Sequence, residues 1–214
     1  CDEKRVIELD NSFILPSFCD VHVHFREPGF GYKETIRQGS LAGARGGYTA
    51  VGTMPNLKPA PSDMDSLRVQ QEIIDRDAVI QVIPYGTITK DQSGTGTLSD
   101  MEGMANHVLA FSDDGKGVQD DGLMREAMNV AKSLNKLIVA HCEDESLLRE
   151  GKVRESEWRQ IERDLKLADE TGCGYHVCHI SCKESVEVIR DAKKSGVNVT
   201  CETAPHYLVL DAED

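Results

Sequence analysis

The stretch Phe18-Cys-Asp-Val-His-Val-His-Phe25 decides the fold of this sequence. Its apolar, β-branched character predicts a strand, and side chains two residues apart on a strand point to the same face. His22 and His24 can therefore converge on one cation, although two histidines on a polar sheet face would show the same spacing. An open doubly wound sheet usually has a glycine-rich phosphate loop after its first strand, whereas this strand ends in His-Val-His. The stretch therefore favours a parallel barrel.

Short strand-like runs and helical stretches alternate along the rest of the chain. The predicted strands are Phe18–Phe25, Tyr48–Thr53, Val79–Ile88, His107–Phe111, Lys136–Ala140, Tyr175–Ile180 and Val197–Thr203. The predicted helices are Tyr32–Gly43, Ser62–Arg76, Asp121–Leu134, Glu157–Thr171 and Cys182–Ser195. This alternation indicates βαβ units and a parallel sheet. We therefore predict an α/β fold, a (β/α)8 TIM-like barrel that is incomplete here at about seven strands.

The composition is that of an acidic globular protein. Of its 214 residues 39% are hydrophobic and 29% are charged, and the formal net charge is −13. Because phosphate contacts need clustered Lys and Arg, this charge argues against nucleic-acid binding. The sequence has no apolar run of about eighteen residues that would predict a membrane span, and we expect no secretion signal. Seven cysteines, an odd number spread through strand-like runs, indicate reduced thiols and a cytoplasmic location.

Polar side chains gather where the predicted strands end. They are His22, His24, Asn56, Asp113, Asp114, His141 and His179. The active site of a parallel barrel lies at the carboxyl ends of its strands. Four histidines with a bridging carboxylate match a site for one or two metal ions that activate water and polarise a carbonyl, which is chemistry for hydrolysing amides. Zinc suits these ligands, and manganese or cobalt could also occupy the site.

Neighbouring residues compete for some of these roles. Either Asp113 or Asp114 can bridge two ions, and the other is then a turn residue. His176 lies three residues before His179, so we expect it to point outward from the barrel.

The run Asp20–Gly29 resembles the signature of the dihydroorotases, which belong to the amidohydrolase superfamily. Similar motifs follow in the same order over nearly the whole chain. They are Thr53-Met-Pro-Asn56, Phe111-Ser-Asp-Asp-Gly115, Ala140-His-Cys-Glu-Asp144, His176-Val-Cys-His-Ile-Ser181 and Pro205-His-Tyr-Leu208. The resemblance implies a zinc-dependent hydrolase of cyclic amides, which reversibly interconverts N-carbamoyl-L-aspartate and L-dihydroorotate in pyrimidine biosynthesis.

The resemblance also implies a set of metal ligands. His22 and His24 would bind one ion, His141 and His179 would bind the other, and Asp114 would bridge the two.

The expected substrate-binding residues are His24, Arg26 and Asn56. Arg26 lies two residues past His24 and faces the same side, and its planar fork suits a substrate carboxylate. The similar allantoinases tend to have Asn at this place, and hydantoinases lack the Arg-Glu-Pro-Gly run. An allantoinase-like or hydantoinase-like enzyme is therefore the first alternative, and a catalytically silent structural relative is the second.

The resemblance also implies a general base, domain boundaries and partners. The general base, an aspartate at the eighth strand, would lie beyond the end of this chain, so the catalytic residue is unassigned. We expect residues 1–15 to be a remnant of a small β-sandwich, and residues 16–214 to be the amidohydrolase barrel, truncated before its last strand. The stretch Glu150–Trp158 is shorter than the resemblance predicts. The expected partners are a small-molecule substrate and either a second copy of the chain or another pyrimidine enzyme, with no nucleic acid and no membrane.

Overall fold

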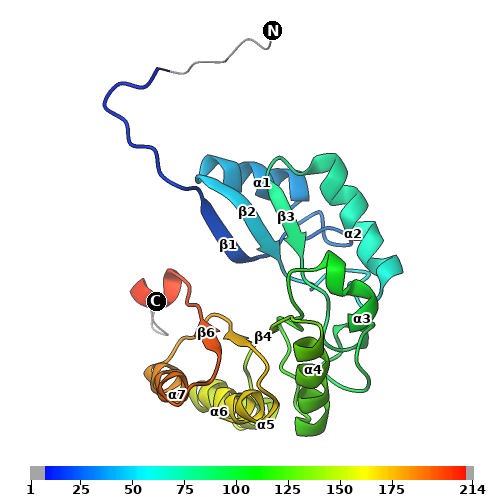
Figure 1. Cartoon of the computed structure of the whole chain (residues 1–214), viewed down its shortest axis with the longest axis vertical. Helices are drawn as coiled ribbons and strands as arrows, with labels where there is room; N and C mark the ends of the chain where they lie inside the picture. The colour runs from blue at the N-terminus through cyan, green and yellow to red at the C-terminus, as the bar shows by residue number, and fades with distance from the viewer. Residues whose placement is uncertain (1–7, 211–214) are drawn as a thin grey trace.

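Two parallel three-stranded sheets form the centre of the computed structural model, which describes residues 8–210 (Figure 1). The first sheet contains β1 (Phe18–Val23), β2 (Tyr48–Thr53) and β3 (Gln81–Pro84). The second sheet contains β4 (Ile138–Ala140), β5 (Tyr175–Val177) and β6 (Val199–Cys201). In both sheets neighbours in space are neighbours in sequence. The predicted α/β class and parallel order of strands are therefore confirmed.

Phe111 joins the two sheets through parallel bridges to Gly86 and Ile138. The prediction of a full strand over His107–Phe111 is wrong, because only this short segment pairs. The 3-10 turn η2 (Ala105–His107) occupies the expected start of the strand. Pro84 also has no N–H, so the end of β3 can accept but cannot donate a ladder hydrogen bond there.

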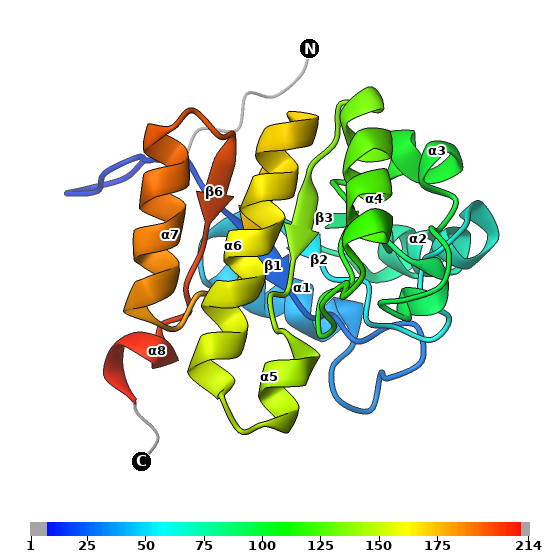
Figure 2. The ribbon, with the colours of Figure 1, turned by 90° about the horizontal axis from the view of Figure 1, so that it is seen from below.

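Helices cover the outer faces of the sheets (Figure 2). The long helices are α1 (Ile36–Arg45), α2 (Met64–Asp77), α4 (Asp121–Ser133), α6 (Val153–Thr171) and α7 (Lys183–Lys194). The short helical segments are η1 (Lys90–Gln92), α3 (Met101–Met104), η2, α5 (Glu145–Arg149) and α8 (His206–Val209). The five predicted helices are confirmed with shifted ends. Thr35, Asp63 and Asp120 each accept a backbone N–H of the first turn, which fixes where α1, α2 and α4 begin.

Alternate residues of β5 face opposite sides of the sheet. Tyr175 and Val177 belong to the large core shared with α4 and α6, whereas His176 lines a cavity on the inner face together with Val139. The expected outward direction of His176 is therefore wrong. The expectation assumed that side chains alternate between the two faces as far as His179. This assumption fails because β5 ends at Val177 and the backbone bends at His179.

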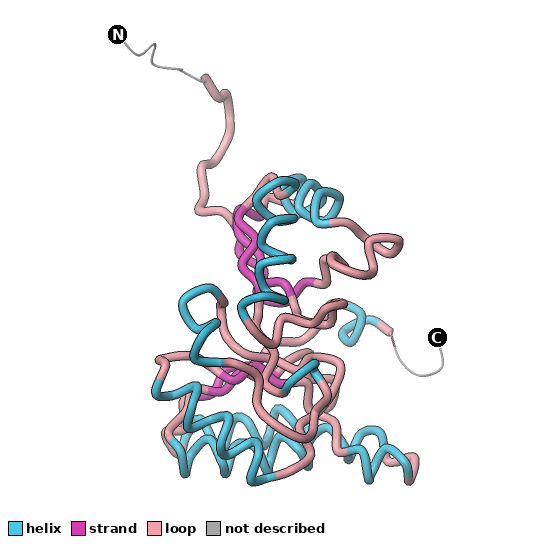
Figure 3. Tube along the Cα trace, turned by 90° about the vertical axis from the view of Figure 1, so that its right-hand side faces the viewer, coloured by secondary structure: helices cyan, strands magenta, loops and turns pink. Residues whose placement is uncertain are grey.

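The first and last described strands, β1 and β6, each have one unpaired edge. Within residues 8–210, β1 pairs only with β2 and β6 pairs only with β5. Residues 8–17 form no strand and extend away from β1 (Figure 3), and residues 1–7 of the predicted sandwich remnant lie outside the described residues. None of the described helices has the length and apolar character needed to cross a membrane.

Candidate metal centre

Four histidines surround the carboxylate of Asp114 at the carboxyl ends of the strands. Its oxygens lie 3.6 Å from His22 Nε2, 3.5 Å from His24 Nε2, 3.7 Å from His141 Nδ1 and 3.2 Å from His179 Nε2. The histidines also meet in pairs. His22 Nε2 lies 3.3 Å from His24 Nε2, and His141 Nδ1 lies 3.1 Å from His179 Nε2. The structure thus brings together all five residues that the sequence nominated as metal ligands.

These separations suit ligands of a shared ion. Two ligand atoms about 2.1 Å from a tetrahedral zinc ion lie about 3.4 Å apart. By contrast, the contacts of 3.6 and 3.7 Å from Asp114 to His22 and His141 are too long for hydrogen bonds. His22 and His179 also approach each other across Asp114, and the ligand atoms of these three residues lie within 4.8 Å of one another.

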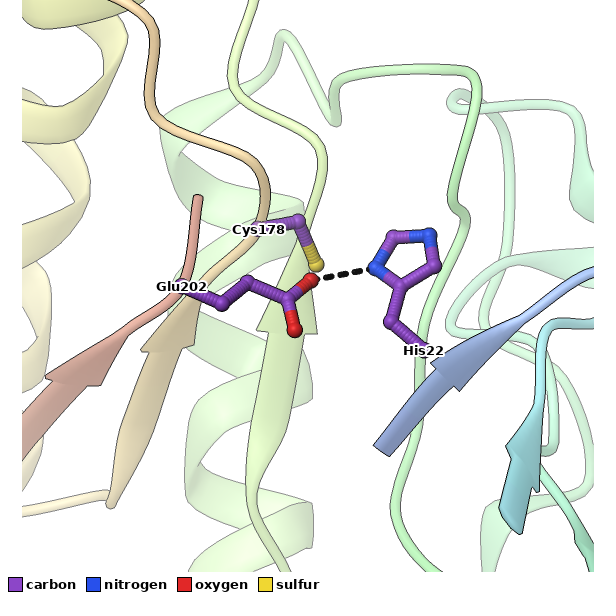
Figure 4. A group of neighbouring side chains, drawn as sticks. All are labelled: His22, Cys178 and Glu202. Atoms are coloured by element: carbon purple, nitrogen blue, oxygen red, sulfur yellow. Dashed lines mark hydrogen bonds and ion pairs between the residues drawn. The ribbon is translucent and has the colours of Figure 1, made fainter. Parts of the chain in front are cut away.

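The outward ring nitrogens of His22 and His24 are held by groups that accept hydrogen bonds. His24 Nδ1 lies 2.9 Å from Oδ1 of Asn56, and His22 Nδ1 contacts the carboxylate of Glu202 (Figure 4). Both Nδ1 atoms must therefore donate, which leaves the two Nε2 atoms with lone pairs that face each other. A cation between them, either a proton or a metal ion, satisfies both lone pairs. This arrangement is typical of metal-bound histidines, whose second nitrogen is fixed by an outer acceptor.

His141 is also held by an acceptor, but at Nε2 rather than at Nδ1. Its Nε2 lies 2.8 Å from Oε2 of Glu143, so Nε2 donates and Nδ1 is the free nitrogen. The backbone of His179 has a positive φ of 34°, and in this conformation its side chain lies in the cluster. A non-glycine residue in this region is uncommon, and at functional sites it indicates that the surrounding structure holds the strain.

The two neighbouring aspartates have different surroundings. Asp113 faces away from the histidines and accepts the backbone N–H of Ile88 at 2.8 Å and of Thr89 at 3.2 Å. It therefore anchors the loop after β3, a larger role than the turn residue that the sequence suggested. Asp114 alone contacts the histidines, which supports the choice of Asp114 as the bridge.

The charge state of Asp114 follows from its neighbours. Burial raises the pKa of this carboxyl, but the contacts with His141 and His179 and the charges of His22 and His24 outweigh burial and hold the pKa well below its usual range. Burial lowers the pKa of His22 and His141, but their carboxylate partners outweigh it and the net pKa of each is raised. Burial dominates at His24 and lowers its pKa. Asp114 therefore stays ionised, and its negative charge favours a bound cation.

Beside the centre lies a pocket of about 320 Å³ that could receive a small molecule. Its walls include Asp20, His22, His24 and His179 on one side and Glu202–Tyr207 on the other. The two other predicted substrate residues do not line it. Arg26 is half-buried and its guanidinium makes no hydrogen bond within residues 8–210, while Asn56 is turned toward His24 and Asp114.

Glu202 and Glu143 are site residues that the sequence reasoning missed. Glu202 follows β6 directly, so the rule that selected the other strand-end residues applies to it as well. Glu143 lies two residues after His141, the spacing that places side chains on one face of an extended segment. The buried thiol of Cys178 lies beside His22 and Glu202 (Figure 4), and burial raises its pKa, which keeps it a neutral thiol.

Comparison with known proteins places this site in a family. Residues 11–185 match the family model described as dihydro-orotase-like. Proteins named dihydroorotase are similar over nearly the whole chain: one from Fusobacterium nucleatum is 50% identical across 99% of this chain, and one from Bacillus licheniformis is 47% identical across 99%. This chain covers 53% of each, so it spans about half the length of the curated relatives it matches.

Solved structures show the same fold at lower identity. L-hydantoinase from Arthrobacter aurescens superposes with a TM-score of 0.80 at 21% identity, covering 92% of this chain and 49% of that chain. An inactive dihydroorotase-like domain of a CAD-like multifunctional protein from Chaetomium thermophilum superposes with a TM-score of 0.69 at 20% identity, covering 94% and 55%. The family match and the identity to the dihydroorotases agree with the motifs around the five gathered residues, and this chain therefore belongs to the dihydro-orotase-like family.

Proposed function

We propose that this protein is a metal-dependent dihydroorotase, which reversibly interconverts N-carbamoyl-L-aspartate and L-dihydroorotate in pyrimidine biosynthesis. The observation that carries the proposal is the meeting of four imidazoles around the buried carboxylate of Asp114. The identity of about half to proteins named dihydroorotase supports the same reaction.

The ligand set fits zinc. His22 and His24 would hold one ion, His141 and His179 would hold a second, and Asp114 would be shared between them. Nitrogen donors with a carboxylate are the ligands that zinc prefers, although manganese or cobalt would accept them. When bound, such ions would lower the pKa of a water molecule and polarise the ring carbonyl of the substrate.

The substrate carboxylate is the proposed ligand of Arg26. The half-buried guanidinium has no hydrogen-bonding partner among the described residues, so its donors are available. The positive charge of Arg26 contributes to the lowered pKa of His24, which supports a location near the centre. Asn56 and His24 would complete this binding site. A carboxylate only accepts hydrogen bonds, so Asn56 would have to share its amide N–H donors between the substrate and Asp114.

We also propose that the fold closes into an eight-stranded barrel, with the last strand between the edges of β1 and β6. Glu202 at the end of β6 already contacts His22 of β1, so the two edges approach each other at the end where the site lies. The general base expected from the family, an aspartate on that strand, would then reach the same centre. The small β-sandwich expected around residues 1–15 belongs to this proposal too.

The proposal also includes a cytoplasmic location, where the enzyme would act as a dimer or together with another pyrimidine enzyme. Cys142, Cys173 and Cys178 are buried free thiols, which are typical of a reducing compartment.

A hydantoinase-like activity is the second candidate, because L-hydantoinase shares the fold. A silent structural role is the third, because an inactive dihydroorotase-like domain shares it as well. The retained set of five gathered residues argues against the silent role, since a silent copy has no need of ligands.

Metal content and turnover test the proposal together. Elemental analysis of the full protein should find close to two zinc ions per chain, and dihydroorotate hydrolysis should stop on chelation and return with zinc. Turnover of hydantoin but not dihydroorotate would replace the substrate assignment, and absence of both metal and turnover would favour the silent role.

A further inference from the structure

Glu143 controls His141 more directly than any other described side chain outside the five gathered residues. Its carboxylate can only accept a hydrogen bond, so the Nε2 atom of His141, 2.8 Å away, must carry the proton. The lone pair of His141 then lies on Nδ1, the atom that faces His179 at 3.1 Å and Asp114 at 3.7 Å.

This choice of nitrogen decides whether His141 can bind an ion. A neutral imidazole carries one proton, and either ring nitrogen can hold it. With the proton on Nδ1, the ring would present an N–H to the centre and could not be a ligand. With the proton on Nε2, the ring presents a lone pair.

The backbone around Glu143 is held on both sides, so the Glu143 side chain starts from a defined position beside His141. Gln119 donates from Nε2 to the Glu143 carbonyl at 2.9 Å, and its Oε1 accepts the Glu145 N–H at 3.0 Å. Asp144 caps α5 by accepting the N–H of Ser146 at 2.8 Å. The segment from His141 to α5 therefore has one defined conformation, in which residues 141 and 143 share a face.

We propose that Glu143 is a positioning residue that sets the tautomer of His141 and thereby holds the metal ion on the His141 and His179 side of the centre. The part that concerns the ion rests on the proposed function, whereas the part that concerns the tautomer does not. His22 and His24 have their own acceptors, Glu202 and Asn56. The ion on their side should therefore not depend on Glu143.

The chain offers a matched control two residues away. Glu145 has the same side chain and similar exposure, 53% against 41% for Glu143, but it pairs with Arg149 rather than with an imidazole. Glu143→Ala removes the acceptor, and Glu143→Gln keeps an acceptor oxygen but loses the charge. Glu145→Ala repeats the truncation without touching the centre.

The first measurement is zinc affinity of the full chain by competition with a chelator. Glu143→Ala should weaken one of the two ions about tenfold and leave the other unchanged, as expected for loss of an outer-shell partner. Glu143→Gln should recover most of the affinity, and Glu145→Ala should match the wild type. Equal affinities in Glu143→Ala and Glu145→Ala would overturn the proposal.

The second measurement is the tautomer of His141 by nitrogen NMR on chelator-treated protein, at a pH above the raised pKa of His141, where the ring is neutral. We expect protonated Nε2 in the wild type and in Glu143→Gln, and a mixture of tautomers in Glu143→Ala. An unchanged tautomer in Glu143→Ala would overturn the proposal even if zinc binds. A wild type that binds no zinc would instead overturn the proposed function, and the NMR comparison would still decide the role of Glu143.

Discussion

The amide oxygen of Asn56 lies 2.9 Å from Nδ1 of His24, and the amide nitrogen of the same side chain donates to Asp114 at 3.1 Å. One side chain thus connects two of the five gathered residues. Asn56 was expected to bind substrate, and this geometry gives it a second role in orienting a metal ligand.

Asn56→Ala should therefore lower metal affinity as well as substrate affinity. Loss of an outer-shell partner typically weakens metal binding by about 10- to 100-fold. Zinc affinity by chelator competition and the KM for dihydroorotate should be measured on the same preparations. A rise in KM with wild-type zinc affinity would mean that Asn56 serves the substrate alone.

The adjacent aspartates should respond in opposite ways to the same substitution. Asp114→Asn removes the charge between the four imidazoles, so we expect loss of bound metal and of most turnover. Asp113→Asn leaves the centre intact but puts an amide N–H against the donors of Ile88 and Thr89. Disrupting such buried hydrogen bonds costs about 1–3 kcal/mol.

Urea unfolding and metal analysis of both variants separate the two roles. Asp113→Asn should have a lower free energy of unfolding and keep its metal. Loss of metal in Asp113→Asn with retention in Asp114→Asn would reverse the assignment of the bridge.

The rhythm of strands and helices was predictable because it depends on local patterns that repeat along the chain. The positions of His22 and His141 followed from that alternation, since parallel strands bring their carboxyl ends together. The choice of Asp114 over Asp113 came instead from the resemblance to the dihydroorotases. The direction of His176 was not predictable in the same way. It depends on where β5 ends and on the left-handed backbone of His179, and both are set by tertiary contacts.

The outer acceptors were harder to recognise for a different reason. Glu202 and His22 are separated by 180 residues and lie on strands that are not paired with each other. A glutamate after a strand looks like an ordinary solvent-exposed residue until the fold places it against an imidazole. Prediction from sequence therefore reached the five gathered residues but missed the groups that orient them.

Metal binding should reverse the pH dependence of stability between pH 6.5 and the raised pKa values of His22 and His141. In this window His22 and His141 bind more protons in the folded chain than in the unfolded one. His24, whose folded pKa is lowered, opposes this trend only near pH 6.5, where its unfolded form is still partly protonated. The chelated protein should therefore lose stability as pH rises, by at most about 1.4 kcal/mol per pH unit for each histidine.

The zinc-loaded protein should gain stability over the same window, because ions bind only the neutral imidazoles and compete with protons. Thermal unfolding at a series of pH values, with and without chelator, measures both slopes. Parallel slopes in the two series would show that zinc does not occupy these histidines.

Arg26→Ala tests the substrate assignment without touching a metal ligand. A charge-assisted hydrogen bond to a carboxylate contributes about 1.5–3 kcal/mol, so kcat/KM for dihydroorotate should fall roughly 10- to 100-fold. Arg26→Lys keeps the charge but loses the planar fork, and it should recover only part of that loss. Zinc content should be unchanged in both variants, because the guanidinium contacts none of the gathered nitrogens. Hydantoin has no such carboxylate, so any turnover of hydantoin should be insensitive to the substitution. Unchanged dihydroorotate kinetics in Arg26→Ala would remove Arg26 from the substrate site, and with it the feature that separates this chain from the hydantoinases.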